Sequence, residues 1–370
     1  MTILPSKASV ARHMLGSTLL LCVLIGVLAS NSSLAFASPK TGGVEKWAYQ
    51  AQGYVESSPD VVNGVVYVGS DDHNVYAINA ATGTEVWAFQ TGSWVSSSPT
   101  EVNGVVYVGS NDGNVYAINA TTGAEVWVFP TQGAVWSSPT VVNGVVYIGS
   151  NDGNVYALNA TTGVEMWAFT TEGGANAGAV ACSPTVVKGV VYFSDDSNIV
   201  YAVNATTGAG IWAYPTGGTS YGSFTSSPAM VGGVVYVGSG NNNVYALNAA
   251  TGKKKWVFQT GNSVISSPVV VKGVVYIGSD DSNVYALNAA TGKEKWAFYA
   301  GFLVESSPVV AKGVVYVGSH DFHVYALNAA TGKEKWAFLT GSDVFSSPAV
   351  AGGVVYVGSD DNNVYALTTK

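Results

Sequence analysis

The residues best suited to recognition stand just before a Ser-Ser-Pro motif that the chain repeats. In each copy a hydrophobic residue precedes this motif, or its variant, by two positions, whereas the residues on either side of it differ between copies. The aromatic, acidic and large apolar side chains at these variable positions include Tyr54, Glu56, Trp94, Trp136, Leu303, Glu305, Asp343 and Phe345. Exposed aromatic rings beside carboxylates suit contact with a protein, a peptide or a carbohydrate. The alternative is that the repeats have drifted and that these side chains only fill the interior.

Groups for catalysis or metal binding are few. The polar turn at residues 280–283 looks superficially like a calcium loop, but polar residues between strands commonly form turns that need no ion. His320 and His323 are close in sequence, yet two histidines without a further ligand make an incomplete metal site. Cys182 replaces a repeated serine and is expected to be a small buried residue. We therefore expect no metal site and assign no catalytic residue.

A regular tryptophan period shows how these positions are organised. A Thr-Gly pair precedes each of eight tryptophans spaced by 40 to 45 residues, namely Trp47, Trp87, Trp127, Trp167, Trp212, Trp256, Trp296 and Trp336. Each complete unit holds four short runs rich in Val, Ile and aromatic residues, which predict strands. Asn-Gly and Thr-Gly pairs between the runs predict turns. No segment after the first forty residues has a helical period, so the repeat is a four-stranded β-unit.

The strand count closes a ring. The segment before the first complete unit supplies one strand, around Trp47, whereas the last unit, from Ser346 to Leu367, lacks its fourth strand. We therefore predict an all-β, eight-bladed β-propeller of four-stranded antiparallel blades. Seven blades are continuous between Ser57 and Phe338, and the N-terminal strand pairs with the C-terminal three strands to complete the eighth.

The repeated tryptophans are expected to hold the blades together. Trp296 and Phe298 stand two residues apart, so they share one face of the outer strand and should pack against the adjoining blade. An aromatic side chain that buries about 150 to 250 Å² contributes about 4 to 6 kcal/mol before entropy is subtracted. We expect this docking role at all eight positions, in place of a role in binding sugar or cofactor.

One face of such a ring is the expected binding face. Connections between blades, and turns between the second and third strands of each blade, gather around the mouth of the central channel. Loops carry function more often than scaffold does. The two longest connections, 170–180 and 216–225, belong to this face. Alternation along the chain turns the hydrophobic position inward and its variable neighbours toward the mouth.

The stretch GVVYIGSDDSNVYALNAATGKEKW, from Gly273 to Trp296, resembles the quinoprotein repeat. This tryptophan-docking unit occurs in dehydrogenases that depend on pyrroloquinoline quinone (PQQ) and in non-enzymatic BamB-type propellers. The resemblance covers essentially all of residues 41–370 and implies an eight-bladed propeller. It leaves the function open, because the family includes both catalysts and protein-binding platforms.

For the catalytic members, the resemblance implies PQQ and a calcium ion over the channel. It also implies a catalytic aspartate, carboxylate and amide ligands, and often a disulfide between adjacent cysteines. This chain has no Cys-Cys pair and almost none of the insertions that usually carry those groups. No catalytic or calcium-binding residue can be carried over, so the chain resembles the BamB-type propellers more, and we expect no cofactor.

The first residues have the features of an export signal. Lys7 and Arg12 precede an uncharged run at 15–30, and small residues near Ala37 suit cleavage, so we predict a signal peptide over 1–37 and a single propeller domain over 41–370. An uncleaved membrane anchor is the rival, although the run is short for a span. Without the leader, 13 basic and 23 acidic residues remain, a formal charge of −10. Nucleic acid and anionic membranes are therefore poor partners.

These features favour an exported binding scaffold. We expect a monomer, secreted or in the cell envelope, without a membrane span after signal cleavage. It would bind a protein or glycan at the cell surface and would have no catalytic activity. The alternative is a PQQ and calcium dependent oxidoreductase acting on alcohols or sugars. A third hypothesis, a purely architectural surface protein, requires no ligand.

Overall fold

The computed structural model describes residues 42–172, 178–217 and 226–370. The chain divides into a unit of residues Met1–Pro39, outside these ranges, and a unit of residues Lys40–Lys370 that holds all the described strands. The expected signal peptide, and parts of the two long connections, therefore lie outside the described residues. Within the described ranges there is no helix of the length and hydrophobicity needed to cross a membrane.

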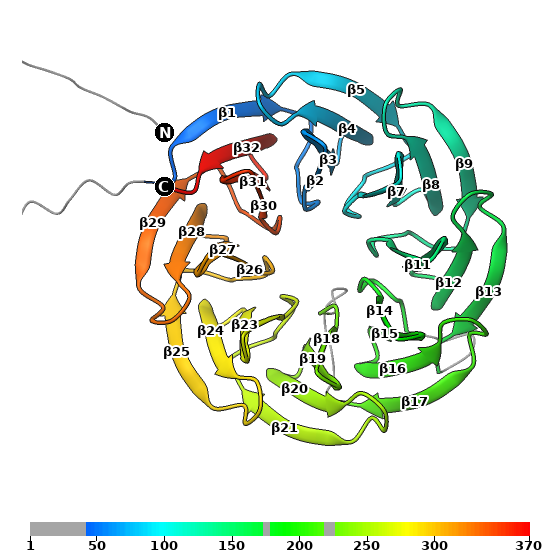
Figure 1. Ribbon diagram of the computed structural model, residues 1–370, viewed down its shortest axis with the longest axis vertical. Coiled ribbons are helices and arrows are strands. Elements are labelled where there is room, and N and C mark those ends of the chain that lie inside the picture. The colour runs from blue at the N-terminus through cyan, green and yellow to red at the C-terminus, as the bar shows by residue number, and fades with distance from the viewer. Residues whose placement is uncertain (1–41, 173–177, 218–225) are drawn as a thin grey trace, which may run out of the picture. The chain divides into compact units, whose positions relative to one another are not determined.

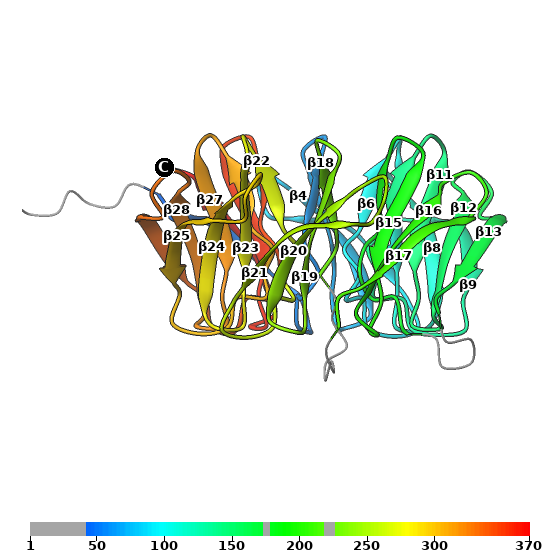
Figure 2. The same cartoon turned by 90° about the horizontal axis from the view of Figure 1, so that it is seen from below.

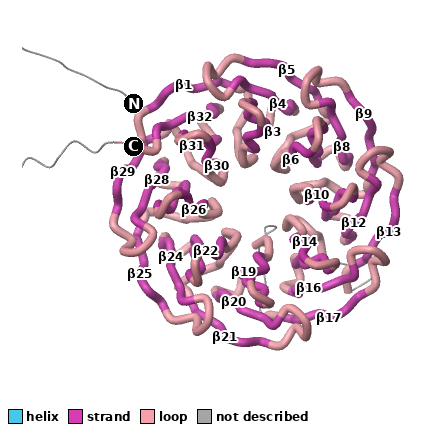
Figure 3. Tube along the Cα trace, in the orientation of Figure 1, coloured by secondary structure: helices cyan, strands magenta, loops and turns pink. Residues whose placement is uncertain are grey.

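The strands form eight antiparallel four-stranded sheets arranged as a ring (Figure 1). Seen edge-on, the strands run between the two faces of the ring (Figure 2). The Cα trace consists of strands and loops throughout its described part (Figure 3). The predicted eight-bladed propeller is confirmed.

The inner half of each blade follows the Ser-Ser-Pro motif. The first, innermost strands are β2 (Asp60–Val62), β6 (Thr100–Val102), β10 (Thr140–Val142), β14 (Thr185–Val187), β18 (Ala229–Val231), β22 (Val269–Val271), β26 (Val309–Ala311) and β30 (Ala349–Ala351). The second strands are β3 (Val65–Gly69), β7 (Val105–Gly109), β11 (Val145–Gly149), β15 (Val190–Ser194), β19 (Val234–Ser239), β23 (Val274–Gly278), β27 (Val314–Gly318) and β31 (Val354–Gly358).

The outer half of each blade contains the tryptophan. The third strands are β4 (Asn74–Asn79), β8 (Asn114–Asn119), β12 (Asn154–Asn159), β16 (Ile199–Asn204), β20 (Asn243–Asn248), β24 (Asn283–Asn288), β28 (His323–Asn328) and β32 (Asn363–Thr368). The outer strands are β1 (Glu45–Gln50), β5 (Glu85–Gln90), β9 (Glu125–Pro130), β13 (Glu165–Thr170), β17 (Gly210–Pro215), β21 (Lys254–Gln259), β25 (Glu294–Tyr299) and β29 (Glu334–Leu339).

Burial explains why the two middle strands are so apolar. Each blade is covered on both faces by its neighbours, so successive residues such as Val66, Tyr67 and Val68 are all buried. The outer strand has one face toward solvent, and its residues alternate between exposed and buried. The hydrophobic core is therefore divided into separate layers between adjacent blades.

The chain ends close the ring as predicted. Strand β1 pairs antiparallel with β32, with Trp47 opposite Ala366 and Gln50 opposite Asn363. The eighth sheet therefore has the order β1-β32-β31-β30. On the inner side, the Ser346 hydroxyl donates to the Ser57 carbonyl at 3.0 Å.

A circle of hydrogen bonds also joins the Ser-Ser-Pro motifs. The backbone N–H of the second serine in each motif donates to the hydroxyl oxygen of the second serine in the next motif, at 2.9 to 3.0 Å. The circle passes through Ser58, Ser98, Ser138, Ser183, Ser227, Ser267, Ser307 and Ser347, and returns to Ser58. This arrangement gives the repeated motif a structural role that the sequence analysis did not foresee.

The tryptophans lie between adjacent blades. The indole N–H of Trp296 donates to the Ala329 carbonyl of the next blade at 3.1 Å, and the ring of Phe298 meets Tyr325 edge-on at 5.1 Å. A β-carbon at Gly332 would come within 2.7 Å of the Trp296 ring, so this turn needs glycine both for its positive φ and for the close approach.

The same indole hydrogen bond recurs at seven tryptophans and is absent at one within the described ranges. Trp336 faces the blade in which the chain ends, where Thr369 stands in place of the usual alanine. Gly42 and Gly43 pack against its ring, and only 1% of Trp336 is exposed. The Trp336 indole N–H is consequently buried without an acceptor among the described residues.

Candidate functional site

The turns and connections of each blade meet at one face of the ring. In the first blade, the backbone N–H of Asp71 donates to the Tyr54 carbonyl at 2.9 Å, and the backbone N–H of Thr91 donates to the His73 carbonyl at 2.8 Å. These bonds join the turn between second and third strands to the connections on either side. We define the mouth face as these turns and connections in all the blades, within the described ranges. The Asn-Gly and Thr-Gly turns meet each other at the opposite end of the strands.

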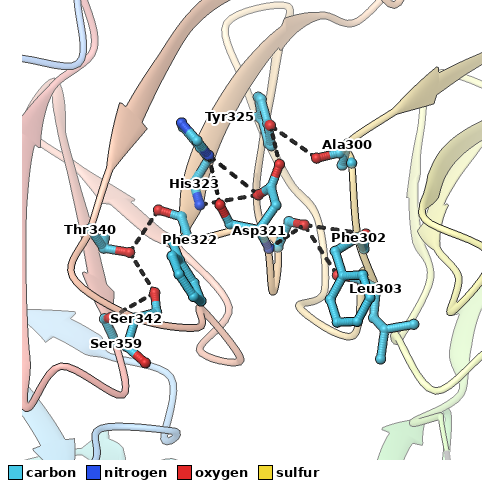
Figure 4. Close-up of polar contacts among 12 residues, drawn as sticks. Ala300, Phe302, Leu303, Asp321, Phe322, His323, Tyr325, Thr340, Ser342 and Ser359 are labelled. Atoms are coloured by element: carbon cyan, nitrogen blue, oxygen red, sulfur yellow. Dashed lines mark hydrogen bonds and ion pairs between the residues drawn. The ribbon is translucent and has the colours of Figure 1, made fainter. Parts of the chain in front are cut away.

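An aspartate in most of these turns has a structural role, shown for the seventh blade in Figure 4. The Tyr325 hydroxyl donates to the Asp321 carboxylate. The Thr340 hydroxyl is close to two carbonyl oxygens, those of Phe322 and Ser342, each at 2.7 Å. These contacts hold the turn against the following connection. The carboxylate of such an aspartate is therefore already hydrogen-bonded within the blade.

The two histidines of the seventh blade face different neighbours. His323 Nδ1 lies 2.9 Å from the Asp321 carbonyl oxygen, and its ring stacks on Tyr325 with centroids 5.5 Å apart. His320 is 7% exposed, and its ring centroid lies 4.0 Å from that of Phe345. The two rings therefore do not share a site. In the part of the chain that the structure describes, no three His, Cys, Asp or Glu side chains are grouped to hold a metal ion.

The hydrophobic residue two positions before each Ser-Ser-Pro motif, here called the wedge residue, is packed between adjacent blades. The seven described residues at this position have no exposed surface, and they are Val55, Val95, Val135, Val180, Val264, Val304 and Val344. A β-carbon at Gly69 would come within 2.5 Å of the Val95 side chain, so the glycine at the end of the second strand makes room for the wedge. The eighth residue, Phe224, lies outside the described residues.

The variable residues that directly precede the buried hydrophobic residue in the sequence reach solvent. Tyr54 is 52% exposed and Trp94 is 53% exposed, so both rings reach solvent. Leu303 is half-buried, and the Asp343 side chain is 34% exposed. These residues place aromatic surface and one carboxylate at the mouth face.

The variable residues that directly follow the buried hydrophobic residue in the sequence are less exposed than those that precede it. Glu56, Trp136 and Phe345 are half-buried, and the Glu305 side chain is 16% exposed.

Three of the predicted site residues, Glu305, Asp343 and Phe345, lie around His320. Its Nε2 lies 3.8 Å from Glu305 Oε2, and its Nδ1 lies 3.9 Å from Asp343 Oδ2. Both distances exceed that of a hydrogen bond, and Nε2 is buried without a hydrogen-bond partner in the described ranges. Burial lowers the pKa of His320, although the charges of Asp343 and Asp321 oppose that change. A mostly neutral imidazole therefore stands between two carboxylates at neutral pH.

The acidic candidates act on one another electrostatically. Burial, with the nearby charge of Asp71, raises the pKa of Glu56 to about 7. Burial also raises the pKa of Glu305 to about 7, and the charges of Asp280, Glu56 and Asp343 add to this effect. These carboxylates come from the sixth, seventh, eighth and first blades, which places them along one continuous arc of the mouth.

One position of this arc was not among the predicted site residues, namely the first residue of each turn between the second and third strands. Several of its side chains have a buried atom without a hydrogen-bond partner in the described part, namely Asp71 Oδ1, Asn111 Oδ1, Asn151 Oδ1, Asp280 Oδ1, His320 Nε2 and Asp360 Oδ1. Burial raises the pKa of Asp360 to about 7, and neighbouring acids, Glu56 first, add to it. The sequence signal was a polar residue there in nearly every blade, beside the structural aspartate.

The mouth is therefore asymmetric. We define the acidic arc as Glu56, Asp71, Asp280, Glu305, His320, Asp343 and Asp360. The second and third blades carry Asn111 and Asn151 at the equivalent turn position, together with Trp94 and Trp136. Within the described ranges, His320 is the only basic group near enough to the arc's acids for an ion pair.

The described mouth residues show no grouped His, Cys, Asp or Glu ligands for a calcium ion. Calcium takes about six to eight oxygen ligands around one point. Here Glu305 and Asp343 approach opposite nitrogens of the His320 ring, and the described residues contain no metal-holding group of three. PQQ is itself a polycarboxylate, which the acidic arc would repel.

Comparisons with known proteins agree with the repeat and the ring. The profile of the family described as outer membrane protein assembly factor BamB matches residues 26–102, 92–298, 217–321 and 300–370. No curated protein sequence matches. Among solved structures, BamB from Moraxella catarrhalis has a TM-score of 0.76 at 18% identity, covering 88% of this chain and 99% of that one.

Enzymes share the same fold. A europium-containing methanol dehydrogenase has a TM-score of 0.75 at 15% identity, covering 88% of this chain and 93% of that one. The quinohemoprotein alcohol dehydrogenase from Comamonas testosteroni has a TM-score of 0.73 at 18% identity, covering 89% and 77%. At these identities the likeness shows the fold alone. The family profile covers nearly the whole described ring, and the chain therefore belongs to the PQQ-like β-propeller family whose profile is described as outer membrane protein assembly factor BamB.

Proposed function

We propose that this protein is an exported, non-catalytic scaffold that binds a protein partner at the mouth face. The observation that carries the proposal is the exposure of about half of Tyr54 and half of Trp94 on that face. Both stand beside an arc of partly buried carboxylates, on a scaffold whose other repeated positions are nearly uniform. Aromatic anchors surrounded by polar groups are typical of the centres of protein interfaces.

Two further observations support the proposal. The family profile carries the description of an assembly factor, and BamB from Moraxella catarrhalis shares the fold. The leader over residues 1–37 supports export, either to the cell envelope or out of the cell. A glycan partner remains the alternative, because exposed aromatic rings also stack on sugars.

Partner capture on the immobilised protein tests this function. The Trp94→Ala and Trp136→Ala double variant is compared with a control double variant, Val126→Ala and Met166→Ala, whose side chains are exposed on outer strands. We expect the mouth variant to lose a protein that both the wild type and the control retain. Retention of every bound species by the mouth variant would show that the mouth is not the binding face. Loss of binding after deglycosylation of the captured fraction would identify a glycan ligand.

The oxidoreductase alternative rests on the dehydrogenases among the structural neighbours. It predicts that PQQ with calcium changes the absorbance of the purified protein and supports dye-linked oxidation of an alcohol or sugar. The binding-scaffold proposal predicts neither signal. Saturable PQQ binding with turnover would replace the scaffold proposal by the enzymatic one.

A further inference from the structure

We propose that the acidic arc receives a lysine or arginine side chain from the partner's polypeptide. This inference rests on the proposed binding role of the mouth face and names the chemistry that the face recognises. It follows from the acceptors that the arc buries, from their spacing, and from the aromatic surface beside them.

The arc presents acceptors in excess of donors. Asp71, Asp280 and Asp360 each bury a carboxylate oxygen that has no hydrogen-bond partner among the described residues. The nine-tenths buried His320 has its Nε2 also without such a partner, 3.8 Å from the Glu305 carboxylate. Buried polar atoms are normally paired, so several unpaired carboxylate oxygens in one arc of the mouth face indicate a ligand rich in donors. Ammonium and guanidinium groups have three and five N–H donors and no acceptor.

The spacing favours an organic cation over a metal ion. A metal ion needs ligand atoms within about 2 to 2.6 Å of one point, and the described acids do not converge in that way. Glu56, Glu305 and Asp360 instead come from three different blades and act on one another through their charges. An alkylammonium or guanidinium group carries several N–H donors and can therefore bind more than one of these carboxylates.

The surface beside the arc favours a polypeptide as the source of the cation. Tyr54 and Phe302 are 52% and 54% exposed, and the centroid of the Phe302 ring lies 6.5 Å from that of His320. Phe302 and Leu303 lie on the connection between β25 and β26 (Figure 4). Lysine and arginine carry long apolar stems and interact favourably with aromatic faces, and neighbouring peptide residues would cover the rest of the exposed rings.

The arc also sets the direction of the pH dependence. A bound cation favours the ionised carboxylates, so binding releases protons and the affinity rises as the pH rises through about 6 to 7. Protonated His320 would repel the cation at lower pH. This effect also makes the affinity rise as the pH rises. The titratable groups that act on the arc, its own members included, are Glu56, Asp71, Asp72, His73, Asp280, Asp281, Glu305, His320, Asp321, Asp343, Asp360 and Asp361.

Fluorescence anisotropy with defined probes tests the inference. The probes are a labelled peptide of alternating lysine and phenylalanine, the same peptide with acetylated lysines, and one with glutamates in place of lysines. The purified protein is compared with Glu56→Gln/Glu305→Gln and with the control Glu125→Gln, which removes a charge from an exposed outer-strand position. We expect only the lysine peptide to bind, about tenfold more weakly to the double variant and about tenfold more weakly at pH 5.5 than at pH 7.5.

Competition with spermidine and with calcium chloride separates the sources of positive charge. The inference is overturned if spermidine or calcium displaces the lysine peptide while the acetylated peptide still binds, or if the control variant weakens binding as much as the double variant. Partner capture separates it from the proposed function. If the Trp94→Ala/Trp136→Ala variant loses the natural partner but Glu56→Gln/Glu305→Gln retains it, binding at the mouth face is supported and the cation inference is refuted. If neither variant loses the partner, both fall.

Discussion

The substitution Glu305→Gln should stabilise the protein at neutral pH. Glu305 has 16% of its side chain exposed and no hydrogen-bonded cation among the described residues, and burial raises its pKa from 4.5 to about 7. A carboxyl with such a pKa holds its proton more tightly in the folded state than in the unfolded state. Its favourable contribution is therefore present below about pH 4.5 and is lost as the pH rises toward 7.

The magnitude follows from that difference in pKa. At about 1.4 kcal/mol per pKa unit, ionising Glu305 destabilises the fold by at most about 3 kcal/mol above pH 7. Glutamine keeps a buried polar group, so we expect the variant to recover about 1 to 2 kcal/mol. For domains of this class, that corresponds to a rise of roughly 2 to 6 °C in the melting temperature.

Differential scanning calorimetry at pH 4.5, 6.0 and 7.5 measures this effect. The melting temperature of Glu305→Gln should exceed that of the wild type at pH 7.5, and the difference should vanish near pH 4.5, where both side chains are neutral. Glu125→Gln, on an exposed outer-strand position, should show no such pH-dependent difference. A lower melting temperature for Glu305→Gln at every pH would refute the electrostatic description of the arc.

Three further substitutions test the ring itself. Trp47→Ala removes the indole that joins the N-terminal strand to the next blade, and should lower the free energy of unfolding by about 3 to 5 kcal/mol in urea titrations. Gly83→Ala should destabilise more than Gly64→Ala, because both have positive φ but only the first would place a β-carbon 2.7 Å from the Trp47 ring; equal melting temperatures would contradict this packing. Ser98→Ala leaves the Ser58 N–H without its acceptor and should cost about 1 to 3 kcal/mol, with faster amide exchange at Ser58.

The fold could be predicted because its determinants are local and periodic. Four β-rich runs and a tryptophan recur at nearly constant spacing, and the missing strand at one end matches the extra strand at the other. Because β1 has no partner strand within its own segment and β32 pairs there only with β31, the pairing of β1 with β32 follows from counting alone. Their register could be expected from the other seven blades.

The arrangement of the mouth could be predicted only in part. Alternation around Val55 indicated that Tyr54 and Glu56 leave the core, but not that one reaches solvent while the other approaches acids from other blades. Those distances depend on the radius and closure of the ring, which no local pattern specifies. Asp360 and Glu56, for example, are brought near each other by the closure between the last and first blades.

The role of individual turn residues was also hidden from sequence reasoning. Asp280 and Asp281 are neighbours of the same type, yet Asp281 accepts the Tyr285 hydroxyl at 2.7 Å whereas Asp280 buries an oxygen without a partner in the described part. Only the direction of each side chain separates the two roles. The sequence favoured a structural turn, which describes Asp281 and leaves the position of Asp280 in the mouth unrecognised.

Site-specific photo-crosslinking tests the central claim most directly. A benzophenone amino acid is placed at Tyr54 or Trp94 on the mouth face, and at Val126 or Met166 on the exposed outer strands, in the chain expressed in its own cells. The account predicts that irradiation gives a discrete adduct with a protein from the mouth positions and none from the outer strands. Adducts from the outer strands alone, or equally from both surfaces, would contradict it.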